Sequence, residues 1–408
     1  MPFIIASGIL IDMHISILGR QPAISIAELE RVYGDVSWFS DISALVQTPA
    51  DADYIDIQRL GGSQKAGRVV LQVPGRDWRA ASLKIVQHYS QAWARREGKV
   101  TLGISAYGFT EGPRDIQKTG LVLKSKLKSS GTSLRLVPNQ ESALSTATSH
   151  HNKLGLADNK VELIVVRGSS GIIVAESTGS QNITALAARD QGRPKRDAFV
   201  GMLPPKLAQI MINLAGPLNV DPSSELTQPR ILDPFVGTGV ILQEAALMNY
   251  AVYGTDLAEK MVRFTGDNLK WLEQKEEKKI NYFLAEGDAM ETTWEQPISA
   301  VVAEGYLGQP FSAPPSNSKL VEVRGNTNHI LSSFLTNLAK QIKPGTPVVL
   351  AVPAWKDTEG HFTHLPLLTK VEELGYSYVQ LRNVRPDQLL YFRPDQVVAR
   401  EILVLVKN

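Results

Sequence analysis

Four acidic residues in the second half of the chain each follow a short apolar run that predicts a β-strand. They are Asp233, Asp256, Asp288 and Glu304. These runs alternate with segments of helical periodicity, so we expect parallel strands whose carboxyl ends meet at one edge of a doubly wound sheet. Carboxylates at such an edge accept hydrogen bonds from hydroxyls and amines. The pattern therefore predicts a ligand site at this edge.

The central unit of this site is predicted by residues 230–256, which read RILDPFVGTGVILQEAALMNYAVYGTD. A strand, a glycine-rich turn, a helix and a second strand follow one another there, as in nucleotide-binding βαβ units. Gly237 and Gly239 let the backbone approach a ligand at positions where a Cβ atom would collide with it. Asp256 lies 19 residues after Gly237, near the spacing of about 20 expected for a carboxylate that binds ribose hydroxyls.

Two features of the turn distinguish between cofactor classes. A dinucleotide-binding turn has a third glycine, but this chain has Leu242 at that position. Asp233 would repel a pyrophosphate, whereas it suits a cation such as the ammonium of a methionine moiety. The pattern Asp-Pro-Phe-x-Gly-Thr-Gly at residues 233–239 resembles the first motif of S-adenosylmethionine-dependent methyltransferases, especially those acting on exocyclic base amines. The alternative is a packing turn in another α/β protein.

Nearly the full chain resembles the THUMP-domain tRNA guanine-N2 methyltransferases of archaea and eukaryotes and their bacterial relatives. The resemblance is carried by LGRQPAISIAELERVYG, RPKRDAFVGMLPPKLAQIMINLAG, DPFVGTGVILQEAA and YFRPDQVVAREILVL. It implies an α/β chain with four parts. These are an α+β ferredoxin-like domain at residues 1–75, a THUMP-like RNA-binding domain at 76–180, a linker and lead-in helix at 181–228, and a Rossmann-like class I methyltransferase domain at 229–408.

The resemblance also implies the cofactor, S-adenosyl-L-methionine, and the reaction, methylation of the N2 amine of a guanosine in tRNA. Asp233 and the two glycines of the turn would hold the methionine end of the cofactor. Asp256 would bind the ribose hydroxyls, and Asp288 the adenine amine. The full predicted cofactor-binding set is Asp233, Pro234, Gly237, Thr238, Gly239, Asp256, Asp288 and Ala289.

The turn after the fourth predicted strand departs from the family pattern, which is Asp-Pro-Pro-Tyr or Asn-Pro-Pro-Tyr. This chain has Glu304-Gly305-Tyr306-Leu307. Glu304 still offers an acceptor for the target amine, and Tyr306 still offers a ring that can stack on a flipped base. We predict that Glu304, Gly305 and Tyr306 form the catalytic turn.

The altered turn leaves other functions open. One alternative is a catalytically silent or partner-dependent tRNA-binding protein that retains the cofactor pocket. Another is a methyltransferase of DNA base amines, which shares the cofactor motifs but not the THUMP-like front. The sequence also leaves open whether a small activating protein subunit is needed.

A basic segment in the first half of the chain predicts a polyanionic partner. Residues 95–135 contain nine Lys or Arg against three acids, while the whole chain has a net charge of +2. Nucleic acid is the partner that such an asymmetry favours, although a solvated helix face would look the same. The predicted RNA-binding residues are Lys124, Lys126 and Lys128 in this segment, and Arg193, Lys195 and Arg196 in the linker.

Composition excludes several other functions. The chain has no cysteine, which rules out disulfides and thiolate sites, and its one close histidine pair, His150-His151, cannot converge on a metal. We therefore expect no metal. No apolar run reaches the roughly 18 residues of a membrane span, so we expect no membrane partner and a cytoplasmic protein.

Five of the elements predicted in the second half are compared with the structure below. They are a lead-in helix at 201–214, a third strand at 279–284, a helix at 367–374, and a closing strand pair at 376–381 and 400–406.

Overall fold

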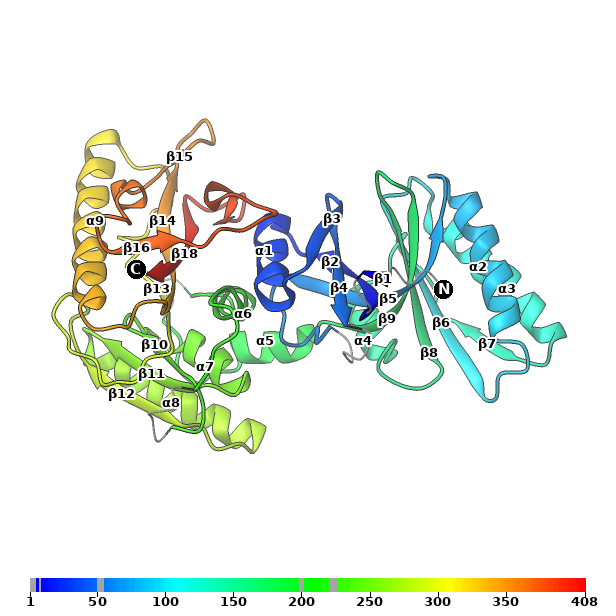
Figure 1. Cartoon of the computed structure of the whole chain (residues 1–408), viewed down its shortest axis with the longest axis horizontal. Helices are drawn as coiled ribbons and strands as arrows, with labels where there is room; N and C mark the ends of the chain where they lie inside the picture. Colours follow the sequence, from blue (N-terminus) through cyan, green and yellow to red (C-terminus); the bar gives the residue numbers. More distant parts are fainter. Residues whose placement is uncertain (1–4, 7–8, 50–54, 198–201, 221–225) are drawn as a thin grey trace. The chain divides into compact units, whose positions relative to one another are not determined.

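The computed structural model describes residues 5–6, 9–49, 55–197, 202–220 and 226–408. It divides into two compact units, Met1–Ala185 and Leu186–Asn408. Each unit is built on its own β-sheet with helices packed against it (Figure 1).

The sheet of the first unit has the strand order β3-β4-β2-β5-β9-β8-β6-β7, with β1 paired to β2. The strands are β1 (Ile5–Ala6), β2 (Ile9–Leu18), β3 (Val36–Ser40), β4 (Ser43–Pro49), β5 (Ser63–Val73), β6 (Lys99–Tyr107), β7 (Ser133–Leu136), β8 (Lys160–Arg167) and β9 (Ile172–Ser180). Because β5 pairs with β9, the sheet continues across residue 75, where the sequence predicts a domain boundary. A ferredoxin-like part and a THUMP-like part within this unit stay a prediction.

The helices of this unit are α1 (Pro22–Tyr33), α2 (Trp78–Ala92), α3 (Pro113–Ser129) and α4 (Thr146–His151), and α5 (Ile183–Gln191) follows the last strand. The α2 and α3 helices lie side by side (Figure 1) and bury Ile85 and Leu123 in one apolar core with β6 and β8. Asp77 caps α2 by accepting a hydrogen bond of 2.8 Å from the Ala80 amide. Proline at the first position of α3 suits a helix start, because its missing N–H has no partner to lose there.

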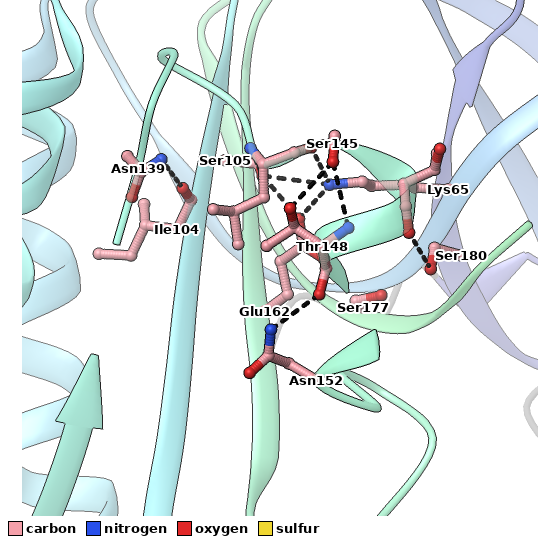
Figure 2. Close-up of polar contacts among 12 residues, drawn as sticks. Lys65, Ile104, Ser105, Asn139, Ser145, Thr148, Asn152, Glu162, Ser177 and Ser180 are labelled. Carbon is pink, nitrogen blue, oxygen red and sulfur yellow. Dashed lines mark hydrogen bonds and ion pairs between the residues drawn. The ribbon is translucent and has the colours of Figure 1, made fainter. Parts of the chain in front are cut away.

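A buried polar network joins three strands of the first unit (Figure 2). Lys65 of β5 forms an ion pair with Glu162 of β8, and neither side chain is more than 1% exposed. The Lys65 ammonium also donates to the Leu144 carbonyl at 2.7 Å, and Ser105 of β6 donates to Glu162 at 2.6 Å. Burial lowers the pKa of Lys65, whereas Glu162 raises it. The pair is thus a specific link between β5 and β8. Removing one partner would leave the other charge buried without a counter-charge.

The sheet of the second unit has the order β12-β11-β10-β13-β14-β18-β16, with β15 on β14 and β17 on β18. The strands are β10 (Arg230–Asp233), β11 (Ala251–Asp256), β12 (Tyr282–Glu286), β13 (Ala300–Glu304), β14 (Pro347–Lys356), β15 (Phe362–Thr363), β16 (Tyr376–Tyr378), β17 (Leu390–Tyr391) and β18 (Val398–Lys407). The five strands from β12 to β14 are parallel, whereas β18 is antiparallel to β14. The strand order reverses at β10, so a crevice opens at the carboxyl ends of β10 and β13.

Helices cover both faces of this sheet. They are α6 (Pro205–Leu214), α7 (Val240–Leu247), α8 (Glu259–Glu276) and α9 (Asn317–Ala339), with the short 3₁₀ turns η1 (Pro366–Thr369) and η2 (Pro386–Gln388). Leu331 and Phe334 of α9 pack with Val301 and Ala303 of β13 in one apolar core, while α6, α7 and α8 lie away from α9 (Figure 1). Alternate residues of β13 therefore face opposite helix layers. The predicted doubly wound α/β fold is confirmed.

Several predicted elements need correction. The third strand begins later than predicted, at Tyr282. The lead-in helix begins at Pro205, and its predicted start at Gly201 lies outside the described residues. The predicted helix at 367–374 is wrong: only the 3₁₀ turn η1 forms, followed by turns that end at Gly375 with φ of 89°. The closing strand pair is confirmed, since β16 pairs with β18.

The buried ion pair predicts a large stability loss when one partner is removed. Lys65→Met leaves Glu162 buried without a counter-charge, so we expect the free energy of unfolding of the first unit to fall by about 3–5 kcal/mol. Urea unfolding followed by circular dichroism measures it.

The matched control is Lys118→Met on α3. The Lys118 side chain is 72% exposed and pairs with Asp115 on the surface, so its loss should change stability by no more than about 1 kcal/mol. Replacing both buried partners, with Lys65→Met and Glu162→Leu, should recover part of the loss. Equal effects of Lys65→Met and Lys118→Met would contradict this role of the pair.

Candidate active site

A cavity of about 960 Å³ opens at the carboxyl ends of β10, β11 and β13. It brings together nearly all of the residues that the sequence predicts for cofactor and catalysis. These are Asp233, Pro234, Gly237, Thr238, Asp256, Asp288, Ala289, Glu304, Gly305 and Tyr306. Gly239 is not part of the lining, but it is the residue before α7 and shapes the turn from behind.

The glycine turn has a backbone conformation that favours glycine at two positions. Gly237 and Gly239 have φ of 52° and 80°, in the left-handed region that favours glycine. A Cβ atom on Gly239 would lie 2.7 Å from Thr265 of α8. Gly237 therefore keeps the turn open toward the cavity, and Gly239 allows α8 to pack against it.

Asp256 at the end of β11 is tied to the same turn. Its two carboxylate oxygens accept hydrogen bonds from the amides of Gly237 at 2.9 Å and Ala258 at 3.0 Å. Burial raises the pKa of Asp256, while these two amides lower it. Each oxygen retains a further lone pair, so the side chain can accept additional hydrogen bonds from a ligand hydroxyl.

Asp233 at the end of β10 is the most deeply buried of the four acids, at 2% exposed. Burial raises its pKa well above the ordinary value, and the nearby Asp256 and Glu304 add to the effect, against one hydrogen bond from the Phe235 amide. A cation in the cavity would favour the ionised form of this side chain, because opposite charges offset the cost of burial.

Asp288 follows β12 and closes a tight turn. It accepts a hydrogen bond from the Met290 amide at 2.9 Å, and its carbonyl accepts from the Thr292 amide at 2.7 Å. A Cβ atom on the preceding Gly287 would lie 2.4 Å from the Thr292 hydroxyl. The turn thus requires glycine at 287 and holds Asp288 at the cavity wall.

Glu304 at the end of β13 forms an ion pair that the sequence prediction missed. Its partner is Arg400 of β18, and the two side chains are 16% and 7% exposed. Burial raises the pKa of Glu304, whereas the Arg400 guanidinium lowers it. One oxygen of Glu304 is therefore engaged by a permanent cation, and Arg400 itself lines the cavity.

The rest of the turn after β13 is shaped by its glycines. The Gly305 amide donates to the Ala351 carbonyl at 2.9 Å, and a Cβ atom on Gly305 would lie 2.8 Å from Leu331. Proline, which the family has at this position, would lose that hydrogen bond and collide with α9. Tyr306 is 40% exposed and lines the cavity, so its ring is available to a ligand.

The predicted RNA-binding residues do not form one group. Lys124, Lys126 and Lys128 lie on α3 in the first unit, and all three are exposed. Arg196 is exposed in the second unit, but Arg193 is buried there at 3%. The charges of Asp190 and Glu244 act on the Arg193 guanidinium within the second unit, and a role of Arg193 in RNA binding stays a prediction.

Lys195 is tied to the glycine turn through Asn268 of α8. The Lys195 amide donates to the Asn268 side chain at 2.9 Å, and that side chain donates to the carbonyls of Lys195 and Thr238. The Lys195 ammonium lies 5.4 Å from the ring centre of Phe264. The linker thus supports the cavity wall, a role that a count of basic residues could not predict.

Acids dominate the charge of the cavity. Six carboxylates and one guanidinium line it among the described residues, namely Asp197, Asp233, Asp256, Asp288, Glu304, Asp395 and Arg400. Such a lining favours a ligand that carries positive charge. In the described part of the chain, no group of His, Asp and Glu side chains is placed to hold a metal ion. Within those same segments, every helix is too short or too polar to cross a bilayer.

The sheet order of the second unit, with the antiparallel β18 inserted before β16, is the Rossmann-like arrangement of class I methyltransferases. Residues 193–295 match a family described as RMKL-like, methyltransferase domain. The matched segment begins in the linker and includes the glycine turn, Asp256 and Asp288.

The proteins that are similar to this chain include two curated proteins and one solved structure. A tRNA (guanine(10)-N2)-dimethyltransferase of Methanothermobacter thermautotrophicus is 30% identical over 172 residues, 42% of this chain and 45% of that protein. The protein with the same name in Pyrococcus abyssi is 35% identical over 111 residues, 27% of this chain and 26% of that protein. The chain thus spans less than half the length of these relatives. The crystal structure of TrmN from Thermus thermophilus aligns with a TM-score of 0.49 and 16% identity, over 98% of this chain and 100% of that one.

The packing of Gly305 predicts the effect of introducing a proline at this position. Gly305→Pro removes the amide that bonds to Ala351 and leaves that buried carbonyl without a partner, so we expect a loss of stability of about 1–3 kcal/mol. The control is Gly325→Ala on α9, where a Cβ atom meets nothing within 4 Å. That change should leave stability equal or raise it by up to about 1 kcal/mol. Thermal unfolding of both variants tests this, and a stable Gly305→Pro variant would refute it.

Proposed function

We propose that this protein is an S-adenosylmethionine-dependent methyltransferase that acts on the N2 amine of a guanosine in tRNA. The observation that carries the proposal is the acidic cavity at the end of the parallel strands, lined by a glycine turn and by Asp233, Asp256, Asp288 and Glu304. The names of the two curated relatives support the substrate, and the matched methyltransferase family supports the cofactor.

The residues of the cavity fit this cofactor. S-adenosylmethionine supplies an electrophilic methyl group on a sulfonium, and it carries a second positive charge on its ammonium. Asp233 and the turn at residues 233–239 would hold the methionine end, where the buried acid offsets the ammonium charge. Asp256 would accept hydrogen bonds from the ribose hydroxyls, and Asp288, beside Ala289, would accept from the adenine amine. A Cβ atom built on Gly237 would have its nearest neighbour at 3.9 Å, so the turn leaves space for the ligand at this position.

Glu304 and Tyr306 would serve the target base. A guanine N2 amine is a poor nucleophile, because its lone pair is delocalised into the ring. Glu304 would accept a hydrogen bond from this amine and align its lone pair with the methyl group, while the Tyr306 ring would stack on the flipped base. The acceleration would come mainly from positioning, for which effective molarities reach about 10⁵–10⁸ M.

The first unit would hold the tRNA. We assign residues 1–75 to a ferredoxin-like part and residues 76–180 to a THUMP-like part on the basis of the sequence resemblance. The exposed lysines of α3 support this role, because lysine side chains can neutralise the phosphates of a nucleic acid. The protein would then act in the cytoplasm, and a small activating subunit is a further proposed partner.

A second candidate function is favoured by the ion pair of Glu304. Because Arg400 engages one oxygen of Glu304, and the family prolines are absent, the protein could bind tRNA and cofactor without transferring the methyl group. The same cavity and the same basic helix would serve that function. Only turnover distinguishes the two candidates.

Cofactor binding should depend on Asp256. Asp256→Ala removes the acceptor for two hydroxyls, and charge-assisted hydrogen bonds of this kind contribute roughly 1.5–3 kcal/mol. Calorimetry with S-adenosylmethionine should therefore give a dissociation constant at least about tenfold higher. Asp267→Ala on α8 is the control, since that side chain is 42% exposed and pairs with Lys195. Unchanged affinity in Asp256→Ala would place the ribose elsewhere.

Binding of tRNA should depend on the lysines of α3. Changing Lys124, Lys126 and Lys128 to Gln should weaken binding and reduce the salt dependence of the affinity by about one unit of slope per lost phosphate contact. Filter binding at a series of salt concentrations measures both. The control changes the same three residues to Arg, which keeps the charge. Equal salt slopes in the Gln and Arg variants would show that RNA binds at another surface.

A further inference from the structure

The ion pair between Glu304 and Arg400 follows from the register of three strands. Glu304 of β13 lies opposite Ala351 of β14, and Arg400 of β18 lies opposite Pro353 of β14. Ala351 and Pro353 are two residues apart, so the two charged side chains project from the same face of the sheet. The small side chains of β14 leave space for them to meet above that strand.

Arg400 is the single cationic side chain among the described residues that line the cavity. Glu304 lies close enough to Asp233 of β10 to raise its pKa. Asp256, Asp288, Asp395 and Tyr306 line the same cavity. A buried carboxyl group among other acids tends to take up a proton. In its protonated form it becomes a donor and loses part of its capacity as an acceptor.

We propose that Arg400 is a positioning residue, which keeps Glu304 ionised and holds its second oxygen toward the target amine. This inference rests on the proposed function, because the amine is the group that needs the acceptor. The Arg400 guanidinium bonds to Glu304 through its Nε atom, which fixes the carboxylate from the side of β18. Glu304 then acts on substrate, and Arg400 acts through Glu304.

The sign of the pH effect follows from the surroundings of Glu304. Burial raises the pKa of Glu304, and Arg400 opposes this rise. Without Arg400 the pKa of Glu304 would be higher, so a larger fraction would be protonated at neutral pH. Activity lost in this way returns as the pH is raised, whereas activity lost through misfolding does not.

The main experiment compares Arg400→Met and Arg400→Lys with the wild-type protein in tRNA methylation between about pH 5.5 and pH 9.5. In Arg400→Met, kcat at neutral pH should fall at least about tenfold, and the acidic limb of the profile should move up by about one pH unit or more. The Kd for S-adenosylmethionine should stay within about twofold, because the role concerns the reacting complex. The kcat and the acidic limb of Arg400→Lys should lie between those of the wild-type protein and Arg400→Met. Unfolding curves verify that each variant is folded.

Arg385→Met is the matched control, since Arg385 pairs with Asp387 on the surface with 73% of its side chain exposed. It should leave the pH profile unchanged. A second readout does not need activity: the carboxyl stretch of Glu304, assigned by Glu304→Gln in protein with ¹³C-labelled glutamate, reports its protonation in the infrared spectrum. Glu304 should titrate at higher pH in Arg400→Met than in wild type.

The outcomes separate the inference from the proposed function. If Glu304 titrates at the same pH in wild type and Arg400→Met, the inference is overturned, whatever the activity. The same holds if Arg400→Met loses activity equally at every pH. If the titration shifts but wild-type protein methylates no RNA, Arg400 still sets the charge of Glu304, and the assignment of a target amine fails with the proposed function.

Discussion

The carboxyl edge of the second sheet buries several acids within one cavity, and the proposed chemistry depends on how their charge is balanced. Asp233 and Glu304 end neighbouring strands, and burial raises the pKa of both. Two kinds of positive charge can offset the free-energy cost of burying these carboxylates in their ionised form. Arg400 belongs to the protein and acts on Glu304, whereas a cationic ligand would act on Asp233. The cavity is therefore expected to bind a cation more tightly than a neutral analogue of the same shape.

The same balance explains why the antiparallel strand matters to the site. β18 is inserted between β14 and β16, and this brings a side chain from the end of the chain to the carboxyl end of β13. Glu304 and Arg400 are separated by 96 residues. In the first unit, Lys65 and Glu162 are likewise distant in sequence and meet across the sheet. In each unit a charged pair thus depends on strand pairing that is set by the whole fold.

Much of the site could be predicted from the sequence because it is local. The glycine turn, its positive φ angles and the placement of Asp256 and Asp288 after strands follow from residues close together in the chain. Arg400 could not be predicted, since its contact with Glu304 requires the order of β13, β14 and β18. The burial of Arg193 could not be predicted either, because the sequence of a basic linker does not show which of its side chains are exposed. A helix was expected at 367–374 from the helical spacing of Leu367 and Val371. Both side chains are buried, but the segment forms only turns, so burial at this spacing does not require a helix.

The measurement that tests the central claim most directly is the nucleoside composition of unmodified tRNA after incubation with the protein and S-adenosylmethionine carrying a deuterated methyl group. Mass spectrometry of the digested RNA should find the label on the N2 atom of guanosine, and Glu304→Ala and Tyr306→Ala should abolish or strongly reduce it while still binding the cofactor. The account is contradicted if the label appears on another atom, if it is absent although both ligands bind, or if the two variants label guanosine at the wild-type rate.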